Sequence, residues 1–163
     1  MIDESLYIYT NTSKALSGNL DELARLQRIG VLAGGAPHSL AIEHKLNFET
    51  AANEMINFNK LALNRVDAVL SQGYMARTGL QCAALRAPKQ SPLPQLLAGI
   101  RQTSKVQPLP LWLATSLKTP EADVLRLRHA LESFRTTARY KMILKRYQSA
   151  QDDHGKYCPQ GEG

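Results

Sequence analysis

The sequence has no long apolar run and few aromatic residues. Nowhere in its 163 residues is there a stretch of roughly 20 apolar residues, the length needed to cross a bilayer, which excludes a membrane-spanning helix. The first residues, Met1 to Ser5, are acidic, whereas a secretory signal peptide begins basic and continues apolar. As written, we expect a soluble chain without a targeting segment.

Nucleotide-binding motifs are also absent. Gly30, Gly34 and Gly35 do not form a G-x-G-x-x-G turn, and no G-K-[ST] motif follows any expected strand. These absences argue against a dinucleotide or a nucleoside triphosphate as ligand.

Side-chain sets for catalysis or metal binding are equally scarce. Ser39 and His44 share an expected helix, but their spacing directs them to different faces, so they do not make a nucleophile and base pair. His154 and Cys158 have a metal-compatible spacing but too few companions. We therefore predict no enzymatic activity, no cofactor and no metal.

The net charge of +6 arises from basic residues spread along the chain. The densest group lies near the C-terminus and consists of Arg135, Arg139, Lys141, Lys145 and Arg146. A solvated basic face is commoner than a nucleic-acid surface, and few aromatic residues accompany these charges. We predict no nucleic-acid partner, and a steep salt dependence of binding would argue for one. The two cysteines, Cys82 and Cys158, fit one disulfide or two free thiols, which leaves the redox compartment open.

The first part of the chain alternates strand and helix patterns. Leu6 to Thr10 is typical of a strand, and the polar stretch Asn11 to Ser17 suits a connector. Asn19 can cap a short helix, and Arg28 to Ala33 indicates a buried strand. A glycine turn at Gly34 and Gly35 then leads into a helix over Pro37 to Leu46.

A second repeat of this alternation follows. Phe48 to Ala52 favours a weak strand, Phe58 to Leu63 a helix that Asn64 closes in the left-handed conformation, and Val66 to Leu70 a buried strand. The resulting order, βαβαβ, favours an α/β fold with a parallel sheet and helical crossovers.

The C-terminal half is divided by prolines. From Gln81 to Pro110 these prolines predict loops and short strands. Leu111 to Thr115 indicates a strand, and Thr119 and Pro120 begin a helix. That helix has one apolar stripe, which comprises Val124, Leu127, Leu131 and Phe134. A last helix is expected over Thr137 to Tyr147, and it should bury Tyr140, Ile143, Leu144 and Tyr147. The tail, Gln148 to Gly163, is expected to be disordered.

Four segments, in order, resemble bacterial periplasmic solute-binding proteins, specifically the extracellular solute-binding proteins of family 3 with the two-lobed type II fold. They are Leu20 to Gly35 (LDELARLQRIGVLAGG), Arg65 to Gln72 (RVDAVLSQ), Leu111 to Ser116 (LWLATS) and Thr119 to Tyr147. The resemblance implies the end of lobe one and a crossing strand in residues 1–12, lobe two in 13–108, and the return of lobe one in 109–147.

The resemblance also implies a gap, because the N-terminal half of lobe one that relatives possess does not precede Leu6. If the polypeptide were complete, the exposed strands and helices would invite a domain swap or a homo-oligomer.

Site residues follow from the same resemblance. Relatives bind ligand anions at the start of the first lobe-two helix, which here comprises Gly35, Ala36, His38 and Ser39. Relatives place an aspartate for the ligand's amino group where this chain has Gln72, and Tyr74 lies near the cleft. Asp67 matches an inner aspartate that is structural. The hinges would be Thr10, Asn11, Thr12, Leu109 and Pro110.

The function that the resemblance implies is binding of a small polar solute in the periplasm. The bound solute would be delivered to a transporter of the ABC type, whose membrane subunits would be the partners. Because Ala36 and Gln72 replace the usual anchors, a free α-amino acid is a poor candidate for the ligand. The alternative is a truncated binding-protein fold that acts as a dimerising interaction module and holds no ligand.

Overall fold

A computed structural model of the chain describes residues 2–11, 16, 19–111, 113–148 and 158. The chain divides into a larger unit, Asp3–Pro110 with His154–Gly163, and a smaller unit, Met1–Ile2 with Leu111–Asp153. The tail expected to be disordered lies outside the described residues, except for Gln148 and Cys158.

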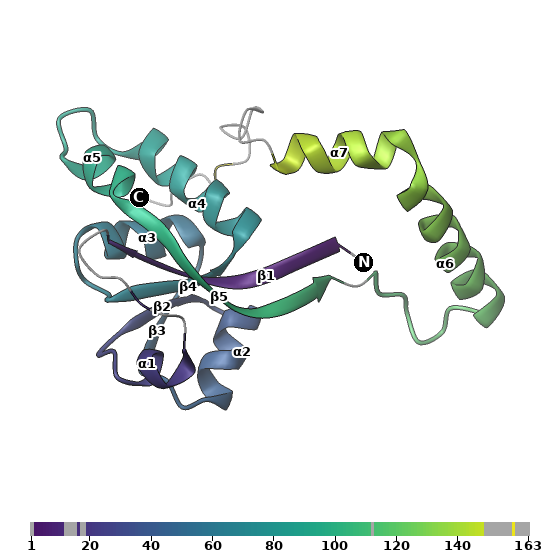
Figure 1. Cartoon of the computed structure of the whole chain (residues 1–163), viewed down its shortest axis with the longest axis horizontal. Helices are drawn as coiled ribbons and strands as arrows, with labels where there is room; N and C mark the ends of the chain where they lie inside the picture. Colours follow the sequence, from purple (N-terminus) through teal and green to yellow (C-terminus); the bar gives the residue numbers. More distant parts are fainter. Residues whose placement is uncertain (1, 12–15, 17–18, 112, 149–157, 159–163) are drawn as a thin grey trace. The chain divides into compact units, whose positions relative to one another are not determined.

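The larger unit is built on a five-stranded sheet with the order β3-β2-β4-β1-β5 (Figure 1). The strands β2 (Ile29–Leu32), β3 (Phe48–Ala51) and β4 (Ala68–Gln72) are parallel to one another, whereas β1 (Ile2–Asn11) runs antiparallel to β4. The strand β5 (Ile100–Leu111) forms the edge beside β1. The predicted βαβαβ order is confirmed, and β1 makes the sheet mixed.

Helices cover both faces of this sheet (Figure 1). The helices α1 (Leu20–Ala24) and α2 (Ala36–Glu43) cover one face, and α3 (Glu54–Ala62), α4 (Gly73–Arg86) and α5 (Leu93–Ala98) cover the other. Each face buries its own apolar cluster, the first including Leu6, Ile8, Val31, Leu40 and Leu70, the second including Phe58, Leu61, Val69, Ala76 and Leu97. Burial of both faces explains why the parallel strands are almost continuously apolar.

Local signals in the sequence set the helix ends of this part. The side chain of Asn19 accepts a hydrogen bond from the Asp21 amide at 2.8 Å, and that of Asn53 accepts one from the Ile56 amide at 3.0 Å. Asn64, just after α3, has φ 54°, which confirms the expected left-handed residue.

The prediction of loops and short strands between Gln81 and Pro110 is wrong. This region contains the end of α4, all of α5 and the long strand β5 except its last residue, Leu111. The helix α4 tolerates Gly79 because α3 passes so close that a Cβ there would lie 2.6 Å from the Cβ of Glu54. The prolines stand where they do not interrupt these elements. Pro92 precedes α5, and Pro108 lies on the edge strand β5, whose outer side pairs with no further strand and so needs no amide hydrogen.

A disulfide joins Cys82 of α4 to Cys158, which settles the alternative that the cysteine count left open. The two cysteines are 1% and 8% exposed. A guanidinium nitrogen of Arg86 donates to the Cys158 carbonyl oxygen at 3.3 Å. The disulfide therefore attaches Cys158 to α4 of the larger unit.

The smaller unit contains two helices, α6 (Glu121–Thr136) and α7 (Ala138–Gln148). A kink at Thr137 separates them, where the Thr137 hydroxyl accepts from the Tyr140 amide at 3.1 Å. The rings of Phe134 and Tyr140 meet edge to face at 5.5 Å. Among the residues described, no helix is long and apolar enough to cross a membrane.

Two predictions for this part of the chain are wrong. Leu113 to Ser116 is irregular rather than a strand, because β5 ends at Leu111. The apolar stripe predicted on α6, for which no burial was predicted, is half-buried to exposed: no residue of α6 is buried and Leu127 is 43% exposed. In α7, Tyr140, Ile143 and Leu144 are half-buried rather than buried, and the side chain of Tyr147 lies outside the described part.

Candidate functional site

Three helices begin at one edge of the sheet. The registers Val31↔Leu70 and Leu32↔Ala51 align the ends of β2, β3 and β4, so their carboxyl ends meet at the same edge. The helices α2, α3 and α4 follow these three strands. In open α/β sheets, ligands bind outside the carboxyl ends of the strands, so this edge is the place to look for a site.

The start of α2 offers little to an anion. Gly34, with φ 71°, makes the turn, and its amide donates to Nδ1 of His38 at 3.1 Å. The amides of His38 and Ser39 donate to the Gly35 carbonyl oxygen, and Pro37 has no amide hydrogen. Within the described part of the chain, Ala36 alone keeps an unpaired amide in this first turn.

His38 is held within the turn rather than directed away from it. Because its Nδ1 accepts from Gly34, the remaining ring proton is on Nε2, and the ring packs edge to face on Phe48 at 5.2 Å. Ser39 is exposed. Of the four residues predicted at the start of α2, these two offer side-chain donors.

The start of α4 is organised by a residue that the sequence analysis missed. Gln72 ends β4 and precedes α4, but its side chain does not cap the helix. Instead, the Glu4 carboxylate of β1 accepts the Gly73 amide at 3.1 Å. Tyr74 is 40% exposed, and burial, followed by the negative charge of Glu4, raises its pKa. Gln72, Tyr74 and Glu4 thus lie together.

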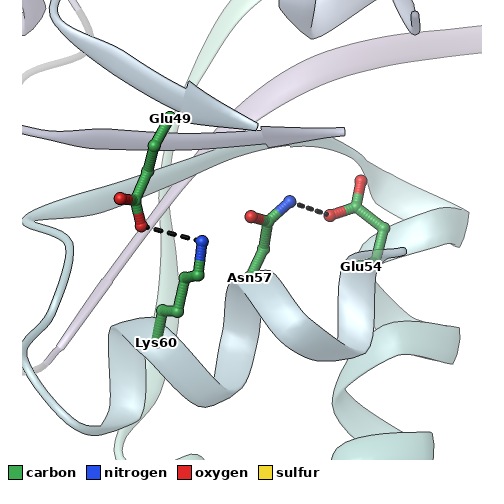
Figure 2. A network of polar contacts seen from close by, with 4 residues as sticks. All are labelled: Glu49, Glu54, Asn57 and Lys60. Carbon is green, nitrogen blue, oxygen red and sulfur yellow. Dashed lines mark hydrogen bonds and ion pairs between the residues drawn. The ribbon is translucent and has the colours of Figure 1, made fainter. Parts of the chain in front are cut away.

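The start of α3 carries a buried polar cluster of a structural kind. Glu54 is buried, and its carboxylate accepts from the Ser71 hydroxyl. It also accepts from the Asn57 side-chain amide at 3.3 Å, a contact that Figure 2 shows. Burial raises the pKa of Glu54, and the two hydrogen bonds oppose that rise. Farther along α3, Lys60 forms an ion pair of 2.9 Å with Glu49 of β3 (Figure 2). These contacts tie α3 to the sheet.

Tyr9 of β1 is a second buried polar group. Its hydroxyl donates to Oε1 of Gln102 in β5 at 3.0 Å, and its ring meets Phe58 edge to face at 5.4 Å. Burial raises the pKa of the Tyr9 phenol, while the positive charge of Arg77 acts in the opposite direction. The neutral phenol therefore serves packing between β1 and β5.

Four of the five predicted hinge residues lie in strands of the sheet. Thr10 is buried in β1, and the side-chain amide of Asn11 donates to the Leu61 carbonyl oxygen at 2.9 Å and to Asn64 at 2.8 Å. Leu109 and Pro110 belong to β5, and Thr12 lies outside the described residues.

Asp67 has the structural role expected of it. Its carboxylate accepts from the amides of Gln27 and Arg28 at 3.0 and 3.1 Å and so fixes the entry to β2.

Comparison with protein-family models and with curated proteins finds no match. Among solved structures, a mutant of ArgBP from T. maritima is 14% identical, with a TM-score of 0.66 over 91% of this chain and 59% of that one. A histidine kinase sensor domain with similarity to periplasmic binding proteins is 11% identical, with a TM-score of 0.64 over 90% of this chain and 60% of that one. This chain has a periplasmic-binding-protein-like fold.

The type II periplasmic-binding-protein-like fold class predicted from the sequence is thereby confirmed. Truncated, arginine-bound ArgBP from T. maritima is a further similar structure, 13% identical, with a TM-score of 0.51 over 66% of this chain and 45% of that one. The chain spans about 45–60% of the length of these solved structures.

Proposed function

We propose that the chain is a solute-binding component of a bacterial transport system, which binds a small polar solute between two lobes. The observation that carries this proposal is the carboxyl edge of the sheet, where α2 and α4 begin and Ala36, Gln72 and Tyr74 present polar groups. The fold it shares with ArgBP, one form of which is arginine-bound, supports the same role.

The proposal divides the chain into two lobes. The sequence predicts lobe two in residues 13–108, but the structure has β1 within the sheet of the larger unit, so the proposal assigns Asp3–Pro110 to lobe two and residues 111–147 to lobe one. The hinges would then lie where the chain passes from one unit to the other, at Asp3 and at Leu109 and Pro110, and not at Thr10 to Thr12. Closure about such hinges would bring both lobes onto the solute. Membrane subunits of the transporter would be the partners of the loaded protein.

Two further parts of the proposal are the compartment and the absence of catalysis. A buried disulfide is typical of an oxidising compartment such as the periplasm. The similar structures are a binding protein and a sensor domain, which favours binding without chemical conversion. Because a sensor domain has the same fold, solute binding is the broader proposal and transport the finer one.

Thermal unfolding of the 163-residue chain with a panel of amino acids, organic acids and amines tests the proposal. A solute at about 100 times its Kd stabilises the folded state by about 2.7 kcal/mol, which corresponds to a rise in Tm of about 5–10 °C. Tyr74→Ala should reduce this rise, and Leu85→Ala, an exposed change on the same helix, should not. If no member of the panel raises Tm, the proposal is wrong.

A dimerising module is the second candidate, favoured by one observation. The helix α6 buries no residue, and Leu127 and Phe134, which are seven residues apart and so share one face, are exposed on it. A second copy of the chain could cover this face, as the apolar surfaces of oligomers usually are. Light scattering at low protein concentration should then show a dimer that Leu127→Glu dissociates; a wild-type monomer would exclude this candidate.

A further inference from the structure

Glu4 has a carboxylate whose position is fixed and of which one oxygen is left without a partner among the described residues. Its Oε1 accepts the amides of Ser5 and Gly73, both at 3.1 Å, which sets the orientation of the group. In the part of the chain that the structure describes, Oε2 has no hydrogen-bond partner, and the ion pairs there join Lys60 to Glu49 and Arg126 to Asp123. One oxygen is therefore available to a ligand.

The sheet register places this carboxylate at the candidate site. Leu6 lies opposite Gln72, and Leu6 and Leu70 both belong to the apolar cluster on the α1 and α2 face. Because side chains alternate along a strand, Glu4 and Gln72 lie on that same side of the sheet. Glu4 thus stands at the carboxyl edge, where its carboxylate contacts the first residue of α4.

Two tyrosine rings accompany the carboxylate. The Tyr74 ring is partly exposed and lies in the field of the Glu4 charge. The Tyr7 ring comes within 3.2 Å of the point where a Cβ at residue 73 would lie, beside the contact of Gly73 with Glu4. A carboxylate flanked by aromatic rings is a combination that recognises cations, through charge-assisted hydrogen bonds and cation–π contacts.

We propose that Glu4 binds a positively charged nitrogen of the solute, an ammonium or guanidinium group, and that this contact makes the site prefer cationic to anionic solutes. The inference rests on the proposed function and names the solute class for the same site. The contrast within the site supports it: the start of α2 keeps one unpaired amide for an anion, that of Ala36, whereas Glu4 offers a full negative charge.

Three probes of equal chain length separate charge from size: cadaverine, which carries two ammonium groups, glutarate, which carries two carboxylates, and neutral pentanediol. Isothermal titration of the full chain at low salt measures their Kd values. The matched variants are Glu4→Gln, whose carbonyl oxygen still accepts the Gly73 amide, and Glu43→Gln, which removes an exposed charge at the far end of α2.

Cadaverine should bind the wild type about tenfold more tightly than pentanediol or glutarate, and Glu4→Gln should remove this preference. Glu43→Gln should bind all three probes as the wild type does. Tyr74→Leu, which leaves the carboxylate in place, should weaken cadaverine binding by about twofold to fivefold.

The results that overturn the inference differ from those that overturn the proposed function. If Glu4→Gln binds cadaverine as tightly as the wild type does, or if only glutarate or another anion binds, the assignment of Glu4 is wrong while solute binding stands. If neither these probes nor any solute of the wider panel binds, the proposed function itself fails.

Discussion

Reduction of the bond between Cys82 and Cys158 should destabilise the larger unit substantially. The two cysteines are 76 residues apart, so the bond closes a long loop in the unfolded chain. In the chain-entropy description, a loop of this length lowers the entropy of the unfolded state enough to stabilise the folded state by about 4.5 kcal/mol. Measured values commonly fall below that figure, so we expect a loss of about 2–4.5 kcal/mol on reduction.

Urea unfolding followed by far-UV circular dichroism, with and without a phosphine reductant, measures this loss. A double variant, Cys82→Ala with Cys158→Ala, is the control, because reductant should leave its unfolding midpoint unchanged. Titration of thiols in denaturant should find none in the oxidised wild type. Two reactive thiols, or an unfolding midpoint that reductant does not move, would refute the reasoning.

Three further changes test the packing around α3. Because the folded state raises the pKa of Glu54, wild-type stability should fall as pH rises from about 4.5 toward that raised pKa. The variant Glu54→Gln should lose this pH dependence, while the control Glu43→Gln should keep it. Equal pH profiles of stability for the wild type and Glu54→Gln would contradict the raised pKa. Gly79→Ala should lower the free energy of unfolding by about 1–3 kcal/mol, because the added methyl group meets α3. The same change in a helix with no close neighbour raises the free energy of unfolding by up to ~1 kcal/mol. A rise in the free energy of unfolding would therefore show that α3 and α4 are farther apart than the structure has them. Asn53→Ala should cost about 1 kcal/mol in urea unfolding through loss of its bond to the Ile56 amide, and an unchanged midpoint would show that the cap contributes nothing.

The elements up to residue 72 could be predicted because their signals are local. The apolar run before Gly34, the left-handed Asn64 and the capping Asn19 each act within a few residues, and the structure has all three. The region from Gly73 to Leu111 could not be predicted, because Gly79 and Pro108 oppose regular structure unless their surroundings are known. The close approach of α3 and the edge position of β5 supply those surroundings.

The candidate site shows the same division. The starts of α2 and α4 follow from the order of the elements, and the residues predicted there, such as Ala36 and Gln72, do stand at helix starts. Glu4 was missed because its contact with Gly73 spans 69 residues and depends on the register of β1 against β4. The spacing of Glu4 two residues before Leu6, on the same side of the strand, was the one local signal that could have indicated it.

The interior position of β1 in the sheet has a consequence for folding during synthesis on the ribosome. Of the five strands of this sheet, β1 is made before the others, whereas its neighbours β4 and β5 are made much later, and the bond from Tyr9 to Gln102 spans 93 residues. At about 5–20 residues per second, the nascent strand waits roughly 5–19 s for its second neighbour. Throughout that time the apolar side chains of Leu6 and Ile8 lack the sheet that buries them, so we expect the emerging chain to depend on a chaperone that shields this segment.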